Sequence, residues 1–443
     1  MEQPLDDTKI TGTQIQKWLS EYFQRPITIK SCNAKKIAAG EGFTSTILRL
    51  ALEYENENDD SLPKSIIVKT PSLPALEDLM KKMGLNQEAQ EQGGQPAEGG
   101  PPVGQQPPAG PPGGAQDQQK PGGKFDLEEM IEFSTFAHSI ECEAYRIFGK
   151  NPPIPLPIVY AATKCHSREM GAIVMEDLGD KSAIIGDPTS ALTLDQLYEA
   201  AEAVASWHAW CLTTDVDWQS HFEPADSERR KQTFSGWFEM MKAVFERVKA
   251  NYPNVFDMLD QHIAKRPLDM EEFSRLLTKH RAIAPDTIVH GDFYANNLMY
   301  EIKKDATGKV TVGSKLISII DWQLSHTGSC MEDFSRLLSM SVDTETRRRH
   351  TKDVLKRYYD SLVKKAGDKV KYSFEDVLTM YDDNLVMAGM FFVLMLDWLQ
   401  NLFVRDAGEE EKRKRQILFE RCLGVYEDII PLLGKMEEER ADL

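Results

Sequence analysis

The chain has 443 residues, of which 41% are hydrophobic and 28% are charged, the composition of an ordinary soluble globular protein. This length suits two or three domains, or one two-lobed enzyme with an insertion. The formal net charge of -18 argues against a nucleic-acid-binding or anionic-membrane-binding surface, because such surfaces need a basic face. The charge excludes little about small ligands, since a metal ion and backbone N–H groups can neutralise phosphates locally.

The cysteines and the apolar segments indicate a compartment. Met1–Lys9 is polar and acidic, so we expect no signal peptide. Leu385–Val404 is the one candidate membrane segment, but Asp397 and Gln400 interrupt it, which favours a buried helix over a membrane span. Six cysteines are scattered without a Cys-x-x-Cys pair, as in reduced cytosolic proteins: Cys32, Cys142, Cys165, Cys211, Cys330 and Cys422. We therefore expect a soluble, cytoplasmic protein.

The first 70 residues predict one helix and three strands. Thr11–Phe23 carries apolar residues at helical spacing. Ile27–Ile37, Thr44–Tyr54 and Ser65–Lys69 are strand-like runs, and a turn containing two glycines joins the first two. Three strands in this order predict a meander of the kind that builds a small β-rich lobe.

Residues 84–124 differ in kind from the rest of the chain. They hold 11 Gly, 8 Pro and 9 Gln in 41 positions and no aromatic residue. Such a segment cannot bury enough apolar surface to offset its ordering entropy, so we expect a disordered insertion. The run Pro107–Pro112 could dock weakly in a proline-recognition groove of a partner, but a solvated linker is the favoured interpretation.

A helix and two more strands are expected after the insertion. Phe125–Phe148 is rich in helix-forming residues, and strand-like runs follow at Ile158–Thr163 and Gly171–Glu176. A turn then predicts a hinge within 176–182.

The remaining sequence predicts a large helical lobe. A capping box at Thr193 opens the first helix, and strands are expected only around a polar loop, at the β-like run Thr287–Val289 and near 297–302 and 309–321. The predicted fold is therefore α+β and two-lobed, of the protein-kinase type. We expect 1–176 to form the N-terminal nucleotide-binding lobe and 177–443 the C-terminal catalytic and acceptor-binding lobe.

Three polar residues carry the strongest chemical signal. Asp292 lies in the stretch His-Gly-Asp-Phe-Tyr-Ala-Asn-Asn, Asn297 ends that stretch, and Asp321 follows an apolar run 29 positions after Asp292. In kinase-like enzymes one carboxylate accepts the proton of the substrate hydroxyl, while an Asn and a second carboxylate hold the metal on the nucleotide phosphates. A tight turn and a strand end would explain each motif alone. Their order and separation together predict ATP- and Mg²⁺-dependent phosphoryl transfer.

Lys69 ends an apolar strand after the glycine turn, where a kinase lysine grips the α- and β-phosphates. Such a lysine needs a carboxylate from the helix that follows, and Glu141 and Glu143 are the nearest candidates. Neighbouring alternate positions on a helix face different ways, so at most one of them points inward. We prefer Glu141 because His138 and Tyr145 share its face.

Backbone groups are expected to complete the nucleotide site. Gly40 and Gly42 would let the chain approach the phosphates, although a simple hairpin turn explains them nearly as well. At the hinge, the carbonyl of Glu176 and the N–H of Leu178 are positioned to pair with adenine.

Structural roles are expected for three other polar residues. His290 precedes Asp292 and is expected to brace the loop by hydrogen bonds. His208 lies on the apolar face of its helix, which indicates a core histidine. Asp333 is expected to cap a helix or to brace the catalytic loop.

These residues resemble the ecdysteroid-kinase-like, or CHK-kinase-like, family of the aminoglycoside phosphotransferase and choline kinase superfamily, and most closely its nematode branch. The resemblance implies a protein-kinase-like fold, Mg-ATP and transfer of the γ-phosphate to a hydroxyl of a small molecule. Phe293-Tyr294 stands where insect members tend to have Leu-Trp, a difference that concerns the acceptor pocket. The matching segments, in family order, are Gly40–Phe43, Lys69, His138–Glu141, Met175–Leu178, Ser206–Ala209, His290–Asp292, Asn296–Asn297, Ile320–Gln323 and Asp333–Phe334.

The leading hypothesis is a small-molecule kinase that acts on a sterol-like, choline-like or glycoside hydroxyl. The alternative is a catalytically weak pseudokinase that serves as a binding or scaffold module. A protein kinase would show His-Arg-Asp, Asp-Phe-Gly and Ala-Pro-Glu, none of which occurs. Aromatic residues of the large lobe could line an apolar acceptor pocket, although core packing is the more common role at helical spacing: Trp207, Trp210, Trp237, Phe391 and Trp398.

Overall fold

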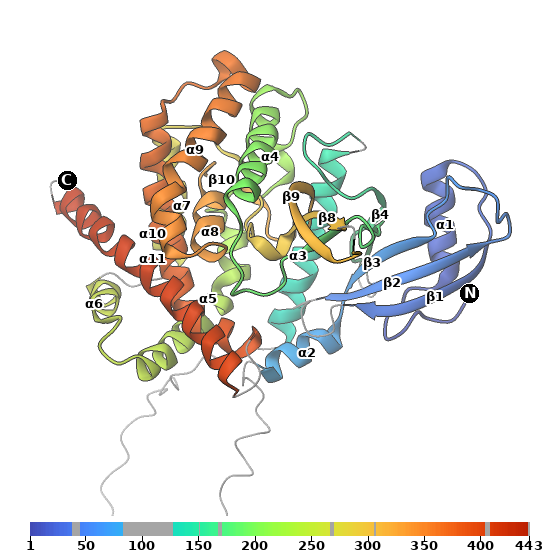
Figure 1. Ribbon diagram of the computed structural model, residues 1–443, viewed down its shortest axis with the longest axis horizontal. Coiled ribbons are helices and arrows are strands. Elements are labelled where there is room, and N and C mark those ends of the chain that lie inside the picture. Colours follow the sequence, from blue (N-terminus) through green and yellow to red (C-terminus); the bar gives the residue numbers. More distant parts are fainter. Residues whose placement is uncertain are drawn as a thin grey trace, which may run out of the picture.

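The computed structural model describes residues 1–37, 45–82, 127–149, 151–166, 171–265, 270–304, 307–403 and 408–441. Figure 1 shows a small lobe built on a sheet and a larger, mainly helical lobe beside it. The predicted α+β class, with a small β-rich lobe and a large mainly helical lobe, is confirmed. The glycine turn with Gly40 and Gly42 and the predicted insertion over 84–124 lie outside the described residues.

An antiparallel sheet of five strands forms the small lobe, in the order β1-β2-β3-β5-β4. Its strands are β1 (Ile29–Ile37), β2 (Ser45–Tyr54), β3 (Ser65–Pro71), β4 (Val159–Thr163) and β5 (Ala172–Glu176). The predicted three-stranded meander is thus one side of a larger sheet, completed by two strands from later in the sequence. Because β5 pairs with β3, the chain leaves for the large lobe from a position beside the strand that carries Lys69.

Helix α1 (Gly12–Phe23) completes the core of the small lobe. Its buried residues Ile15 and Leu19 belong to the same apolar cluster as Leu48 of β2. Thr11 caps the helix: its side chain accepts from the Gln14 N–H, while the Gln14 side chain accepts from the Thr11 N–H. Satisfying two of the free N–H groups in this way fixes where the helix begins.

Helix α3 (Leu127–Phe148) lies between the sheet and the large lobe (Figure 1). It contacts β3 and β4 on one side and α5 of the large lobe on another, and the short helix α2 (Leu73–Lys82) packs against it. Side chains of α3 therefore meet the end of β3, where Lys69 lies.

Two small sheets frame the polar loop of the large lobe. One has the order β6-β8-β9, and the other pairs β7 with β10. The strands are β6 (Ser182–Ile184), β7 (Thr287–Val289), β8 (Leu298–Lys304), β9 (Val310–Ile319) and β10 (His326–Gly328). The sequence interpretation missed β6 and β10, because three residues are too few to show an alternating pattern. The loop that holds Asp292 runs between β7 and β8, and Asp321 follows the end of β9.

The rest of the large lobe is helical. The predicted capping box of α4 is present, with the Thr193 side chain accepting from the Gln196 N–H and the Gln196 side chain accepting from the Thr193 N–H. The helices are α4 (Leu194–Thr213), α5 (Glu228–Asn251), α6 (Asp257–Lys265), α7 (Met270–Thr278), α8 (Glu332–Met340), α9 (Thr344–Ala366), α10 (Phe374–Phe403) and α11 (Glu409–Ala441).

Helix α10 contains the apolar stretch considered above. Within the described residues it holds the one segment long and apolar enough to cross a membrane, Phe374–Asp397, and 72% of its apolar window is buried. It packs against α5, α8 and α11. Burial by neighbouring helices is the arrangement of a core helix.

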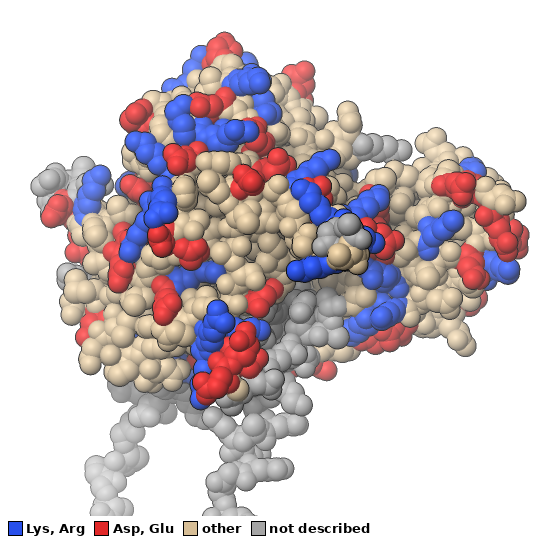
Figure 2. All heavy atoms as spheres, viewed as in Figure 1, with Lys and Arg blue, Asp and Glu red and all other residues tan. Residues whose placement is uncertain are grey.

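The acidic charge is distributed rather than concentrated on the face that Figure 2 shows. Acidic and basic side chains alternate there over both lobes. Exposed ion pairs one helical turn apart also occur in the described chain, such as Lys356 with Asp360. Exposed pairs of this kind contribute little to stability, typically below about 1 kcal/mol.

Candidate active site

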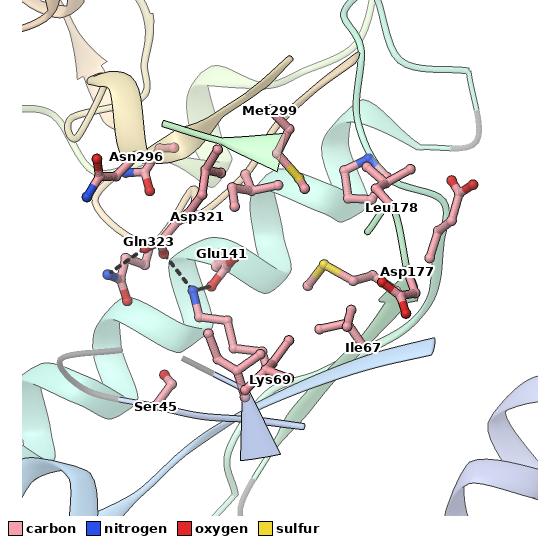
Figure 3. Close-up of a pocket in the computed structure, with 18 of the residues that line it drawn as sticks. Ser45, Ile67, Lys69, Glu141, Asp177, Leu178, Asn296, Met299, Asp321 and Gln323 are labelled. Carbon is pink, nitrogen blue, oxygen red and sulfur yellow. Dashed lines mark hydrogen bonds and ion pairs between the residues drawn. The ribbon is translucent and has the colours of Figure 1, made fainter. Parts of the chain in front are cut away.

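A cleft of about 280 Å³ lies between the two lobes. Its walls are mainly apolar, and Ile67 of β3 and Met299 of β8 lie on opposite sides of it (Figure 3). A narrow apolar slot with a few polar groups at its ends suits a flat aromatic ring that carries a charged tail. The lining residues include Ile37, Ile47, Ile67, Lys69, Glu141, Tyr145, Met175, Glu176, Asp177, Leu178, Ile184, Asp292, Asn297, Met299, Ile320, Asp321 and Gln323.

Lys69 bridges the two carboxylates at the polar end of the cleft. Its Nζ lies 2.6 Å from Glu141 Oε2 and 2.6 Å from Asp321 Oδ1 (Figure 3). Burial alone would lower the pKa of Lys69, but the two carboxylates raise it above its ordinary value. The lysine is therefore a fixed cation, held at the junction of β3, α3 and the end of β9.

The two candidate glutamates of α3 point in different directions. Glu141 is buried and faces Lys69, whereas Glu143 contacts Arg146 and Lys164 on the other side of the helix. The structure therefore places Glu141, not Glu143, in the cleft. Helix periodicity decides this, since residues two positions apart lie on different faces.

Asp292 and Asn297 face each other within the polar loop. Asn297 Nδ2 donates to the Asp292 carbonyl at 2.8 Å and to Asp292 Oδ2 at 3.1 Å. Gly291 has φ +81°, and a Cβ there would lie 2.5 Å from the Leu324 carbonyl oxygen. The sharp turn that presents Asp292 therefore requires glycine.

A hydrogen-bonded frame holds this loop. Asp333 Oδ2 accepts from the His290 N–H at 2.8 Å, and its Oδ1 accepts from the Gly291 N–H at 3.0 Å. His290 Nε2 donates to the Ile320 carbonyl at 2.9 Å, and its Nδ1 accepts from the Asp292 N–H at 3.2 Å. This frame joins the loop around Asp292 to the turn around Asp321. His290 and Asp333 therefore brace the catalytic loop, as expected from the sequence. Asp333 lies in the first turn of α8 and does not act as its N-cap.

Burial sets the charge of this loop. It lowers the pKa of His290 to about 4, so the ring is neutral and carries its proton on Nε2. Burial also raises the pKa of the Asp292 carboxyl to about 6, with Arg336 opposing and Asp321 adding to that shift. A carboxylate with a raised pKa is a better proton acceptor than an ordinary one, yet it is still mostly ionised at neutral pH.

Asp321 has a backbone conformation that is uncommon for a residue other than glycine, with φ +67°. Its side chain accepts from Lys69 and, at 3.3 Å, from Gln323 Nε2. Positive φ is costly for most side chains and is found more often at functional sites than elsewhere. The turn aims the carboxylate into the cleft.

Asp321 and Asn297 offer the oxygen atoms that Mg²⁺ prefers. Asn297 uses its Nδ2 on Asp292, which leaves its Oδ1 without a hydrogen-bond partner among the described residues. Mg²⁺ commonly takes one or two protein oxygens and completes its shell with water and phosphate oxygens. The donor set therefore fits Mg²⁺ held jointly with a nucleotide. No group of three His, Cys, Asp or Glu residues in the described ranges would hold a metal on its own.

The hinge presents backbone groups to the cleft. Glu176 and Leu178 both line it, and the Leu178 N–H has no hydrogen-bond partner among the described residues. The Glu176 side chain points away, to Lys181 at 2.6 Å. Within the described chain, the Leu178 N–H is thus left unpaired beside the cleft, while the Glu176 carboxylate is occupied by Lys181.

A family model covers well over half of the chain. The DUF1679 model, described as "Uncharacterized oxidoreductase dhs-27", matches residues 112–434. The chain belongs to the DUF1679 family. The matched region includes Glu141, Asp292, Asn297 and Asp321, while Lys69 precedes it.

Two curated relatives of this DUF1679 member come from Caenorhabditis elegans. The "Uncharacterized oxidoreductase dhs-27" is 27% identical over 381 residues, which are 84% of this chain and 40% of that protein. An uncharacterized kinase-like protein is 21% identical over 284 residues, which are 62% of this chain and 70% of that protein. The chain therefore spans less than half of the first relative's length.

Solved structures of small-molecule kinases overlay on the DUF1679 chain at low identity. Choline kinase from Cryptosporidium parvum Iowa II has a TM-score of 0.47 and 13% identity, covering 91% of this chain and 90% of that chain. A putative aminoglycoside phosphotransferase from Ralstonia eutropha JMP134 has a TM-score of 0.43 and 10% identity, covering 95% of this chain and 98% of that one. At TM-scores below 0.5, neither likeness bears on the function of the chain.

Two contacts of the DUF1679 site were missed from the sequence. Arg49 of β2 pairs with Asp177 at the hinge, with 2.7 Å between Nε and Oδ2, and Ser65 Oγ donates to the same carboxylate at 2.6 Å. Arg336 of α8 lies 3.7 Å from Asp292. Arg49 and Asp177 are 128 positions apart, and such a pairing leaves no local pattern.

Some of the aromatic residues considered for the acceptor pocket lie in the core, and others are partly exposed. Trp207 is fully buried, and its Nε1 donates to the Ile288 carbonyl at 3.0 Å, which supports the strand before the polar loop. His208 is buried beside it and contacts Tyr358 Oη at 2.9 Å, as expected of a core histidine. The side chains of Trp237 and Trp398 lie outside the described residues.

Proposed function

We propose that the chain is an ATP-dependent phosphotransferase that transfers the γ-phosphate to a hydroxyl of a small molecule. The observation that carries this proposal is the position of Lys69, 2.6 Å from both Glu141 and Asp321 in the same cleft as Asp292. A buried lysine held by a helix carboxylate and by a metal-ligand carboxylate is the arrangement that grips nucleotide phosphates in kinases.

The cleft can hold ATP along its length. The apolar slot between Ile67 and Met299 suits the adenine ring, with its edge toward the Glu176 carbonyl and the Leu178 N–H. Lys69 then lies at the phosphate end. Its fixed positive charge attracts the phosphates, and the two carboxylates keep the ammonium from turning away.

Asp321 and Asn297 would hold Mg²⁺ on the phosphates. When bound, the metal neutralises charge that develops on the transferred phosphoryl group. The oxygen atoms of these two residues suit that ion, as described above.

Asp292 is the proposed catalytic base. Asn297 fixes one of its carboxylate oxygens, which orients the group toward an incoming hydroxyl. The acceptor hydroxyl gives its proton to Asp292 late in the transfer, as its oxygen bonds to the γ-phosphorus and after the bond from that phosphorus to the leaving ADP oxygen is largely broken. The frame of His290 and Asp333 keeps the base in place, so little reorganisation is needed.

The names of the two relatives point to different chemistries. An oxidoreductase with a dinucleotide site is usually built on a parallel sheet with a crossover helix. The strand pairs of the described residues are all antiparallel, apart from one isolated bridge between Pro224 and Thr327. This supports the kinase-like name of the second relative over the oxidoreductase name of the first as a guide to this chain.

The acceptor class and the compartment are part of the proposal. We propose a sterol-like, choline-like or glycoside hydroxyl as the acceptor, and the scattered cysteines support the cytoplasm as the compartment. A pseudokinase scaffold is the competing function, and retention of Lys69, Asp292, Asn297 and Asp321 in one cleft favours an enzyme.

The experiment combines nucleotide binding with phosphate transfer. Purified protein is incubated with Mg-ATP labelled on the γ-phosphate and with a metabolite extract, and new phosphorylated products are identified by mass spectrometry. We expect products with the wild type and none with Asp292→Asn, while a thermal-shift assay shows Mg-ATP binding to both. Exposed Asp360→Asn is the matched control and should behave as the wild type. The proposal would be contradicted if the wild type did not bind Mg-ATP, or if Asp292→Asn transferred phosphate as well as the wild type.

A further inference from the structure

Arg336 lies beside the proposed base but outside the nucleotide cleft. Its Nη1 is 3.7 Å from Asp292 Oδ1, whereas Asn297 occupies the other carboxylate oxygen. Asn297 and Lys69 line the cleft, and Arg336 is absent from its described lining residues. Arg336 therefore contacts Asp292 from outside the set of residues that line the cleft. An acceptor must approach from outside the nucleotide site to stand in line with the transferred phosphate.

The guanidinium of Arg336 is held in place, yet its donors are unused. Its Cζ lies over the ring of Phe391 on α10, 4.8 Å from the centroid, a cation–π contact that helps to hold the side chain in place. The 3.7 Å contact with Asp292 is too long for a hydrogen bond, and none of its N–H groups has a hydrogen-bond partner within the described residues. The Arg336 side chain is 17% exposed, and its guanidinium carries five donors that a ligand beside Asp292 could use.

The neighbouring carboxylates are committed to other partners. Glu332 accepts from His326 Nε2 at 3.1 Å, and Asp333 accepts from the two backbone N–H groups of the catalytic loop. Neither is within ion-pair distance of Arg336. Within the described residues, Asp292 is thus the one carboxylate within 4 Å of Arg336, and Glu332 and Asp333 act on it only from farther away.

We propose that Arg336 is an acceptor-binding residue that pairs with an anionic group close to the hydroxyl that receives the phosphate. The inference rests on the proposed function and narrows its substrate class. It predicts an acceptor with a carboxylate, phosphate ester or sulfate ester, rather than a quaternary ammonium compound or an aminoglycoside. A fixed cation beside the base repels a cationic acceptor and pairs well with an oxyanion through two parallel hydrogen bonds.

A purely structural role makes a different prediction. If Arg336 only neutralises Asp292, the charge of the acceptor does not matter, and the loss of Arg336 alters turnover without altering the concentration of acceptor that gives half the maximal rate. These two roles are separable by experiment.

The first test separates a metabolite extract on an anion-exchange column. The anionic fraction and the combined neutral and cationic fraction are each incubated with the full chain and γ-labelled Mg-ATP. We expect label transfer in the anionic fraction and at least tenfold less in the other. Transfer confined to the neutral and cationic fraction would overturn the inference while leaving the proposed function intact. No transfer in either fraction would overturn the proposed function, and the inference with it.

The second test uses variants of Arg336 with the active fraction. Arg336→Gln should raise the amount of that fraction needed for half-maximal rate at least tenfold, and Arg336→Lys should recover part of the loss. The KM for ATP should change less than twofold in both variants. Phe391→Leu keeps the charge but removes the cation–π contact, so it should give an intermediate effect even where Arg336→Gln folds poorly. A lowered maximal rate with unchanged dependence on the fraction would assign Arg336 a structural role instead.

Discussion

Lys69 and Glu141 form a buried ion pair with 2.6 Å between Nζ and Oε2, although 72 positions separate them in the sequence. The pair joins β3 of the small lobe to α3, and Lys69 continues the connection to Asp321 of the large lobe. The contacts of Lys69 therefore hold β3, α3 and the turn after β9 together. Any change in the position of α3 changes the position of the proposed phosphate-binding lysine.

Replacing Glu141 by Gln should weaken nucleotide binding and turnover. The neutral amide cannot hold the ammonium as the carboxylate does, and Lys69 is left with Asp321, which is also the proposed metal ligand. Loss of one partner of a buried pair costs about 3 kcal/mol or more. We therefore expect turnover to fall at least tenfold and the Kd for Mg-ATP to rise, as measured by calorimetry.

The matched control for this variant lies two positions away on the same helix. Glu143→Gln removes a carboxylate that faces Arg146 and Lys164, outside the cleft. Its Kd for Mg-ATP should stay within about twofold of the wild type. Equal losses in both variants would show that the effect comes from the stability of α3 rather than from Lys69.

Asp333 should contribute more to stability than an exposed aspartate. It accepts two backbone N–H groups of the catalytic loop, and the amide of Asp333→Asn has one oxygen, so at least one buried N–H loses its partner. An unsatisfied buried donor costs about 1–3 kcal/mol in the free energy of unfolding. Urea denaturation of Asp333→Asn should show a loss in that range. Asp360→Asn, which breaks an exposed pair with Lys356, should lose less than about 0.5 kcal/mol.

Local motifs were enough to find the polar end of the cleft. Asp292 and Asn297 lie five positions apart in one loop, and Asp321 follows an apolar strand, so each carries a signature within a few residues. Helix periodicity then distinguished Glu141 from Glu143. These residues meet in one cleft because α3, the loop after β7 and the turn after β9 all border it.

Other parts of the site were not accessible from sequence patterns. The Arg49–Asp177 pair joins residues 128 positions apart, and neither a charged residue within β2 nor one just after β5 stood out in the sequence. Arg336 lies among ordinary helix residues, and only the packing of α8 against α10 shows that it contacts Phe391. Long-range pairings of this kind are set by topology, which local periodicity does not encode.

Gly291 should be irreplaceable for two separable reasons. An added Cβ meets the Leu324 carbonyl oxygen at 2.5 Å, and the residue has φ +81°. Gly308 has the same φ, but nothing lies within 4 Å of a Cβ built there. Gly308→Ala should therefore lose only the dihedral cost of about 1–2 kcal/mol in unfolding free energy. Gly291→Ala should lose more and should also abolish phosphate transfer, because the turn that presents Asp292 must move. Similar losses in both variants would mean that the contact with Leu324 relaxes freely.

The Arg49–Asp177 pair should tune nucleotide affinity rather than the chemical step. It ties β2 to the hinge through two contacts, from Nε and Nη2 of Arg49 to the two carboxylate oxygens of Asp177. Ser65 Oγ adds a third contact to the same carboxylate. Arg49→Met keeps much of the length of the side chain but removes both contacts to Asp177. We expect the KM for ATP to rise about threefold to tenfold with kcat nearly unchanged, since the base and the metal ligands lie at the other end of the cleft. A fall in kcat at unchanged KM would contradict this role.

Glu143 should stabilise the folded chain near neutral pH, and this contribution should be lost in acid. Burial alone would raise the pKa of its carboxyl, but hydrogen bonds from Arg146 and Lys164 lower it to about 2, below the value of about 4.3 expected in the unfolded chain. The unfolded chain therefore binds a proton between these two pH values and the folded chain does not, so stability rises with pH across this window. The contribution of Glu143 is complete above about pH 5 and is lost as the pH falls toward 2. The difference in unfolding free energy between the wild type and Glu143→Gln, measured by urea titration from pH 6 to pH 3, should shrink as the pH decreases. A difference that stays constant over this range would show that the interactions of Glu143 do not depend on its charge.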